Sequence, residues 1–322
     1  MLFRSLLGGQ GNDVLLGGLN DDSLEGGDNN DSLTGDAGQD TLLGGAGADT
    51  LDGGDGDDLL DAGAAYIFLS IFQTANQLRG GAGNDSLIGG SNQDNLDGGD
   101  DNDTLRGGGD NDTLRGGGGN DRFEVDAGSD TVQDLEGSDV LVVSAGATAN
   151  ATVSANFTAT AATSNAGNAN LTVANGINAD LSAATGSNGF TLTAAGTSSG
   201  SQLIGSALAD TLTGGNGNDS LSGGGGNDSL SGGSGGDTLR GGLGADRLSG
   251  GASTTSSQDL FLFAFGDTDL VTGAASPPDV SRRDKVLDWT NGPDGGSYVP
   301  VDRIGVSGTS ITAMAKIGRA HV

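Results

Sequence analysis

The chain has 322 residues, of which 64 are glycine and none is cysteine, and its formal net charge is -30 at pH 7. The lack of cysteine excludes disulfides and thiolate metal sites, and the negative charge disfavours binding to nucleic acid or to anionic membranes. Because His321 is the only histidine, an H-E-x-x-H zinc site is excluded and a Ser-His-Asp triad is not supported. We therefore predict that the chain is not an enzyme.

A nine-residue repeat runs in phase from Gly8 to Val142, within a first array that we place at residues 1–142. The unit at 80–88, "GGAGNDSLI", shows the pattern, with glycine at positions one, two and four, aspartate at six and an apolar residue at eight. Glycine permits positive φ and close backbone approach, so the first six residues are expected to form a turn and the last three a short strand. Two units are expected to complete one coil, with position eight pointing inward.

This pattern resembles the calcium-binding nonapeptide repeat GGxGxDxUx of the RTX (repeats-in-toxin, haemolysin-type) family. The resemblance implies an all-β fold, a parallel β-roll that is a right-handed β-solenoid, with several Ca²⁺ ions as cofactors. Ordering nine residues costs more free energy than burying one leucine returns, so ion binding is expected to supply the difference. The chain is therefore predicted to be largely disordered without Ca²⁺.

The position-six aspartates are the candidate metal ligands. Their carboxylates and the loop carbonyls of successive coils are expected to face each other as the hard oxygen ligands that Ca²⁺ prefers. The candidate side chains are Asp13, Asp22, Asp31, Asp40, Asp49, Asp58, Asp85, Asp94, Asp103, Asp112, Asp121, Asp210, Asp219, Asp228, Asp237 and Asp246. The backbone is expected to contribute at Gly8, Gly9, Gly11, Gly80, Gly81, Gly83, Gly214, Gly215 and Gly217. If each ion lies between units n and n+2, the chain is expected to bind up to about twelve ions.

Residues 62–79, "AGAAYIFLSIFQTANQLR", keep the phase but lose the ligands, because Ile67 and Asn76 replace the aspartates. Leu69 and Leu78 still fall on position eight, so we predict one complete coil without metal. The alternative is a looped-out apolar hook for a partner. The apolar run is far too short to span a bilayer, and no membrane span is predicted.

Residues 143–204 are rich in Ala, Ser, Thr and Asn and form a connecting segment between the arrays. Leu171, Leu181, Leu192 and Leu203 recur at ten or eleven residues, which predicts metal-poor solenoid rungs in the later part. For residues 143–168 a flexible linker is an equal alternative. The repeat then returns in a second array at 205–249.

Residues 250–315 are predicted to form a C-terminal β cap, because solenoids need their open core closed. The alternative is an irregular tail. The side chains expected to close the core are Phe261, Phe263, Phe265, Val286, Leu287, Trp289 and Ile304. Residues 316–322 can be encoded by a common sequencing-adapter sequence and are interpreted as an artefact. Residues 1–7 lack a signal peptide, and Leu6 falls on position eight, so the chain is expected to begin within a repeat.

The resemblance implies a calcium-dependent folding segment of a secreted, extracellular protein from a Gram-negative-type bacterium. The implied partners are calcium ions and a type I secretion apparatus, and a surface or carbohydrate partner is left open. The segment is expected to have a structural, adhesive or secretion-assisting role. The alternative is the non-catalytic tail of a secreted protease, lipase or alginate-modifying enzyme.

Overall fold

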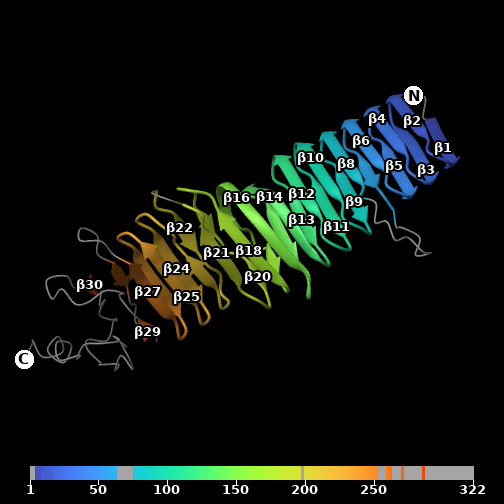
Figure 1. Cartoon of the computed structure of the whole chain (residues 1–322). Coiled ribbons are helices and arrows are strands. Elements are labelled where there is room, and N and C mark those ends of the chain that lie inside the picture. The colour runs from blue at the N-terminus through green and yellow to red at the C-terminus, as the bar shows by residue number, and fades with distance from the viewer. Residues whose placement is uncertain are drawn as a thin grey trace, which may run out of the picture. The chain divides into compact units, whose positions relative to one another are not determined.

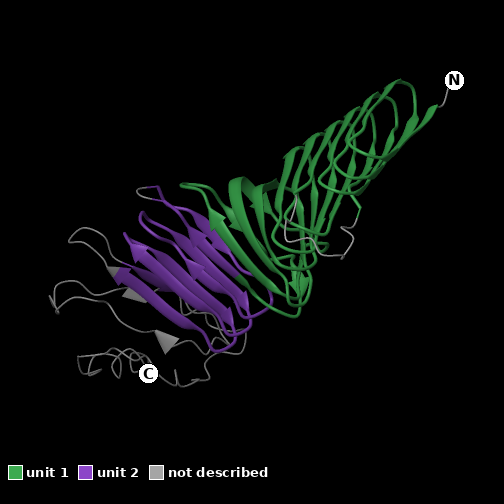
Figure 2. Cartoon of the chain, turned by 45° about the vertical axis from the view of Figure 1, so that its right-hand side comes forward, with its two compact units in different colours: residues 1–190 green, residues 191–322 purple. Residues whose placement is uncertain are grey.

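The computed structural model describes residues 4–63, 75–196, 199–252, 259–262, 270–271 and 285–286. The regular secondary structure within these residues consists only of β-strands, and the strands pair in parallel. The all-β, parallel solenoid predicted from the repeat is therefore confirmed. The chain divides into two compact units, residues 1–190 and 191–322, which Figure 2 colours separately.

The strands of the first unit form two series, and most strands pair with the next but one along the chain. The first series is β1 (Arg4–Gln10), β3 (Asp22–Asp28), β5 (Thr41–Ala46), β7 (Leu59–Asp61), β9 (Ser86–Gly90), β11 (Thr104–Gly108), β13 (Arg122–Val125), β15 (Val140–Val143), β17 (Ser164–Asn165) and β20 (Thr185–Gly186). The second is β2 (Val14–Leu19), β4 (Ser32–Ala37), β6 (Thr50–Asp55), β8 (Gln77–Ala82), β10 (Asn95–Asp100), β12 (Thr113–Gly118), β14 (Ser129–Gly137), β16 (Thr148–Thr158), β18 (Asn168–Val173) and β19 (Ala179–Asp180). Figure 1 shows the even-numbered strands β2, β4, β6, β8, β10 and β12 following one another side by side.

The register of these strands confirms two units per coil. Leu15 pairs with Leu33, and Leu96 pairs with Leu114, so equivalent positions lie 18 residues apart. Leu6 pairs with Leu24, which places it on position eight as the repeat predicts.

Position eight forms the core, because side chains alternate along a strand and only every second one points inward. In β10, Leu96 is buried between the more exposed Asn95 and Asp97. In the first array, the position-eight side chains with an exposed fraction of 2 % or less are Leu24, Leu33, Leu42, Leu51, Leu60, Leu78, Leu87, Leu96, Leu105, Leu114, Phe123, Val132 and Leu141.

The strands are longer than the three residues predicted for each unit. β5 covers positions seven to nine of one unit and continues through Gly44, Gly45 and Ala46 of the next. Gly27 pairs directly with Gly45, and a Cβ atom on Gly45 would overlap Gly27 O. The double glycine therefore continues the strand, because it lets stacked backbones approach closely, and the turn is reduced to positions four to six.

Strand pairing changes its offset around residues 62–79. Leu51 pairs with Leu78, and Leu60 pairs with Leu87. The backbone N–H of Asp58 likewise donates to Asp85 Oδ1, which lies 27 residues further along the chain instead of 18. The difference is the length of one nine-residue repeat. The prediction of one complete coil at 62–79 is therefore wrong.

Residues 62–79 instead supply one nine-residue repeat, in which a longer connection separates the glycine of position two from the side chain of position six. Gly63 lies against Gly45 O as a position-two glycine does, and Asn76 occupies position six. Ala62 precedes Gly63 at position one and is buried. Ile67, Leu69 and the apolar hook considered as the alternative lie outside the described residues.

Residues 144–190 form further rungs with wider spacing. β16 pairs with β18 so that Ala151 lies beside Leu171, and Asn170 bonds to Asn150, 20 residues away. Leu171 and Leu181 are buried. Small and aliphatic core residues thus continue the stack where position-six aspartates are missing, and the pairing favours rungs over a flexible linker.

The second unit contains two series of parallel strands. The first is β21 (Phe190–Ala194), β23 (Thr211–Thr213), β25 (Ser229–Ser234), β27 (Arg247–Ala252) and β29 (Leu270–Val271). The second is β22 (Gln202–Ile204), β24 (Ser220–Gly225), β26 (Thr238–Leu243), β28 (Leu260–Leu262) and β30 (Lys285–Val286). Leu192 and Leu203 are both fully buried, as their spacing predicts.

The repeat extends past its predicted end at 249. Phe261 pairs with Leu239 and is buried, so it occupies position eight of a further unit rather than a separate cap. Val286 lies in β30 and pairs with Phe261. The remaining predicted cap side chains, Phe263, Phe265, Leu287, Trp289 and Ile304, and the segment 316–322 lie outside the described residues.

Candidate metal centre

In each of the two compact units, the position-six side chains of successive coils form rows along the turns. The Oδ1 atom of Asp103 accepts the backbone N–H of Asp85 at 2.8 Å, and the Oδ1 atom of Asp121 accepts that of Asp103 at 2.8 Å. Row one contains Asp22, Asp40, Asp58, Asp85, Asp103, Asp121 and Asp139. Row two contains Asp13, Asp31, Asp49, Asn76, Asp94, Asp112 and Asp130. Each carboxylate therefore uses one oxygen to join two coils.

The second unit contains two shorter rows of the same kind. Row three contains Ser201, Asp219, Asp237 and Asp259. Row four contains Asp210, Asp228 and Asp246. Rows three and four show that the second array repeats the bonding of the first.

The second carboxylate oxygen, Oδ2, has no hydrogen-bond partner in most of these residues although it is buried. These unpartnered oxygens belong to Asp13, Asp22, Asp31, Asp40, Asp49, Asp58, Asp85, Asp94, Asp103, Asp112, Asp130, Asp219, Asp228, Asp237 and Asp246. A buried polar atom without a partner is costly, and such atoms are rare in native proteins. A regular series of them indicates that each oxygen binds a group that the protein does not supply.

The unpartnered oxygen converges with a backbone carbonyl oxygen beside the position-one glycine. A Cβ atom on Gly98 would overlap Asp103 Oδ2 and would lie 2.6 Å from Gly116 O, one coil further on. The same arrangement recurs at Gly80, which lies against Asp85 Oδ2 and Gly98 O. Two oxygen acceptors thus face each other with no hydrogen atom between them, as a bound cation requires.

Alanine at Gly98 is expected to disrupt this site and to lower both stability and calcium affinity. Gly118→Ala is the matched control, because a Cβ atom there would meet only Asp100 Oδ1, at 3.9 Å, and φ is not positive. Urea unfolding in Ca²⁺ measures the difference, which we expect to exceed about 2 kcal/mol because overpacking commonly costs 1–3 kcal/mol before any ligand is lost. Equal stability of the two variants would contradict this geometry.

Burial and mutual repulsion raise the pKa of many position-six carboxyl groups. Desolvation is the largest cause at Asp94 and Asp103, repulsion by Asp112 or Asp85 adds to it, and the accepted backbone N–H opposes it. The pKa rises to about 7 for Asp58, Asp94, Asp103, Asp130, Asp139 and Asp228. It rises to about 6 for Asp49, Asp85, Asp112 and Asp237. Ionisation of these groups near neutral pH therefore calls for a neutralising cation.

The donor set suits calcium. Beside regular position-one glycines such as Gly98 lie one carboxylate oxygen and one backbone carbonyl oxygen. Among the described residues, no group of three or more acidic or histidine side chains is placed to hold a metal ion by itself. Ca²⁺ accepts such mixed oxygen ligands in flexible geometry, whereas zinc prefers nitrogen and sulfur.

The predicted glycines lie on the strand ends and turns that precede these aspartates. Position one is represented by Gly8, Gly80 and Gly214, each beside its own unit's Oδ2. Positions two and four have positive φ, at Gly9, Gly11, Gly81, Gly83, Gly215 and Gly217. Among the candidate aspartates, Asp210 differs because its Oδ2 accepts hydrogen bonds from Ser206.

Three aspartates of the rows were not among the metal ligands predicted from the sequence. Asp130 and Asp139 occupy position six of the two looser units at 125–142, and the repeat itself contained that signal. Asp259 was hidden, because four extra residues separate it from Gly250, yet its Oδ1 accepts the backbone N–H of Asp237 at 3.0 Å. The same atoms as in the regular units therefore meet across a longer connection.

A second ladder, on the outer side of the turns, was also missed. At position five, Asn84 Oδ1 accepts the backbone N–H of Asn102 at 3.1 Å, and Asn102 Oδ1 accepts that of Asn120 at 2.8 Å. These side chains are exposed. This ladder joins coils without any ion, and the frequent Asn before the aspartate was its signal.

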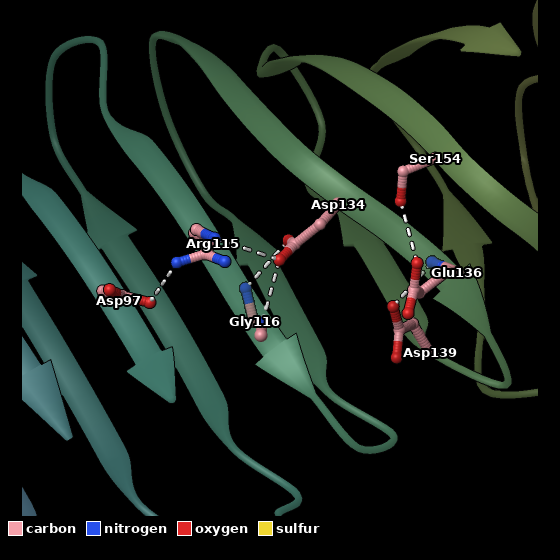
Figure 3. Close-up of polar contacts among 8 residues, drawn as sticks. Asp97, Arg115, Gly116, Asp134, Glu136, Asp139 and Ser154 are labelled. Carbon is pink, nitrogen blue, oxygen red and sulfur yellow. Dashed lines mark hydrogen bonds and ion pairs between the residues drawn. The ribbon is translucent and has the colours of Figure 1, made fainter. Parts of the chain in front are cut away.

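Row one ends near β14, where side chains replace the next glycine turn (Figure 3). Asp134 accepts the N–H groups of Gly116 and Gly117, both at 2.9 Å, and Arg115 lies between Asp134 and Asp97. Asp139 Oδ2 accepts the N–H of Glu136 at 2.8 Å, so this carboxylate is satisfied by the protein. The regular metal-type turn therefore stops at Asp139.

A family model described as the RTX calcium-binding nonapeptide repeat (four copies) matches residues 7–42, 34–65, 72–105, 97–132, 204–239 and 231–254. The matches cover just over half of the chain and coincide with the rows of aspartates. The chain belongs to the RTX calcium-binding nonapeptide repeat family. A search of curated proteins found no match to this sequence. The matched residues are therefore calcium-binding repeats of the RTX type.

Proposed function

We propose that this RTX chain is a calcium-dependent folding segment of a secreted bacterial protein, with a structural, adhesive or secretion-assisting role. The observation that carries the proposal is the series of buried, unpartnered Oδ2 atoms beside carbonyl oxygens. Without a cation these atoms repel each other, and with one they become ligands. The free energy of ion binding is then part of the free energy of folding.

This linkage suits export through a type I apparatus. A ligand that binds only the folded state stabilises it in proportion to its concentration relative to its dissociation constant. Calcium is scarce in the cytosol and abundant outside, so the chain would remain unfolded before export and fold afterwards. Within the described residues, no helix is long and apolar enough to cross a bilayer.

Circular dichroism during a calcium titration tests the proposal. We expect a change from coil to β-structure at roughly 10⁻⁴ to 10⁻³ M Ca²⁺, the range typical of extracellular modules. Mg²⁺ is the control and is expected to fail at equal concentration, because it demands a smaller, octahedral ligand shell. A chain that is fully β-structured in EDTA would contradict the proposal.

A further inference from the structure

Asn76 takes the place of an aspartate in row two and makes the same first contact. Its Oδ1 atom accepts the backbone N–H of Asp49 at 2.8 Å, just as Asp49 Oδ1 accepts that of Asp31 at 2.9 Å. The amide nitrogen Nδ2 of Asn76 therefore corresponds to the unpartnered Oδ2 of the aspartates.

Unlike those oxygens, the amide nitrogen of Asn76 has hydrogen-bond partners. Asn76 Nδ2 donates to Asp94 Oδ1 at 2.8 Å and to Gly89 O at 3.3 Å. Gly89 is the position-one glycine one coil further on. In the regular unit of Asp31, the equivalent carbonyl is that of Gly44, and the side-chain atom that lies with it beside Gly26 is the unpartnered Asp31 Oδ2 rather than an N–H donor. Asn76 thus places an N–H donor beside the position-one carbonyl oxygen and the next Oδ1 atom of the row, where the regular units place a carboxylate oxygen without a partner.

The position-one residue of this unit supports the same conclusion. Regular units have glycine there, because a Cβ atom would overlap Oδ2, as at Gly26 beside Asp31. The Asn76 unit has Ala62, whose methyl group is buried. Ala62 still lies in its column, since its N–H donates to Ile88 O at 2.9 Å. This turn therefore accepts a methyl group beside the position-six side chain.

An independent instance occurs in row four. The backbone N–H and the hydroxyl of Ser206 lie 2.6 Å and 2.9 Å from Asp210 Oδ2 and donate to it. Ser206 stands at position two, where most units have glycine. Here too the protein supplies donors to an oxygen that other units leave unpartnered.

We propose that Asn76 and Ser206 replace calcium ions at two turns, so that these turns form without metal. The Asn76 turn joins the coils on either side of the long connection between Gly63 and Asn76. An ion-independent contact there holds the register at the point where the offset between coils changes from 18 to 27 residues. This inference rests on the calcium-dependent folding proposed above.

The first test is Asn76→Asp, combined with Ala62→Gly to restore the regular unit. Native mass spectrometry is expected to detect about one additional Ca²⁺ per chain, because the new carboxylate creates a ligand without a donor. Asn102→Asp is the matched control, since it adds the same charge on the exposed position-five ladder, and it is expected to add none. An unchanged ion count in the Asn76 variant would overturn the inference.

The second test transplants the amide into a regular turn, as Asp31→Asn. We expect about one ion fewer, with folding at an equal or lower Ca²⁺ concentration than the unmodified chain, whereas Asp31→Ala should need more Ca²⁺. Equal damage by Asn and Ala would overturn the inference. The two proposals fail differently: a chain that binds no Ca²⁺ refutes the proposed function, while a calcium-binding chain with unchanged counts refutes only this inference.

Discussion

Asp103→Ala is expected to raise the Ca²⁺ concentration needed for folding by at least about tenfold, which corresponds to 1.4 kcal/mol. The variant loses the unpartnered Oδ2 ligand and also leaves the buried Asp85 N–H without its acceptor. A buried unpaired donor alone costs about 1–3 kcal/mol. Because Asp103 Oδ1 contacts the coil before it and Asp103 Oδ2 lies with Gly116 O of the next coil beside Gly98, the loss of the side chain affects contacts on both sides.

Two variants separate these contributions. Asp103→Asn keeps the Oδ1 acceptor and replaces Oδ2 by a donor, so it is expected to bind about one ion fewer than the unmodified chain and to fold at a Ca²⁺ concentration that is no higher. Asp100→Ala, at an exposed position-three residue nearby, removes a carboxylate of the same charge outside the row. Calcium titrations followed by circular dichroism compare the three, and equal midpoints for Asp100→Ala and Asp103→Ala would show that row one is not the binding site.

The metal-free chain is expected to gain β-structure as the pH falls. The pKa of Asp94 and Asp103 rises from 3.8 to about 7 in the fold, mainly through burial. A group with a raised pKa is protonated more readily when folded, so its stabilising effect is complete below pH 3.8 and is lost as the pH rises through about 7. Circular dichroism in EDTA across this range measures the change.

Calcium is expected to reverse that dependence. Ion binding requires deprotonated carboxylates, so calcium affinity should fall as the pH drops below about 6. Repeating both titrations at high ionic strength is the control, because salt screens exposed charges much more than buried ones. Metal-free β-structure that increases with rising pH, or calcium affinity independent of pH, would contradict the assignment of the buried carboxylates.

The repeat period predicted most of the fold because the residues within each nine-residue repeat determine which side chain points into the core and which lies on the turn. Leu96 lies in the core and Asp103 lies in a row because position eight alternates inward and position six ends a glycine turn. The continuation of the strands through the double glycines was not predicted. Glycine has a weak strand propensity, and this propensity takes no account of how closely stacked backbones approach each other.

The departures from the repeat could not be predicted because contacts between distant residues decide them. Counting in steps of nine residues placed Ile67 at position six of a repeat. The hydrogen bond from the backbone N–H of Asp58 to Asp85 Oδ1 shows instead that these two residues are neighbours in row one. Asp259 likewise joins row three after extra residues. Turns on the outside of a solenoid can lengthen at little cost, so register depends on which atoms meet rather than on spacing.

The most direct test of the account is a crystal structure of the calcium-loaded chain, with anomalous scattering used to locate the ions. We predict peaks beside the Oδ2 atoms of regular turns, such as Asp31 and Asp103, each also within ligand distance of a position-one carbonyl oxygen. We predict no peak beside Asn76. Ions on the outer faces of the strands, or no ions along the rows of aspartates, would contradict the account.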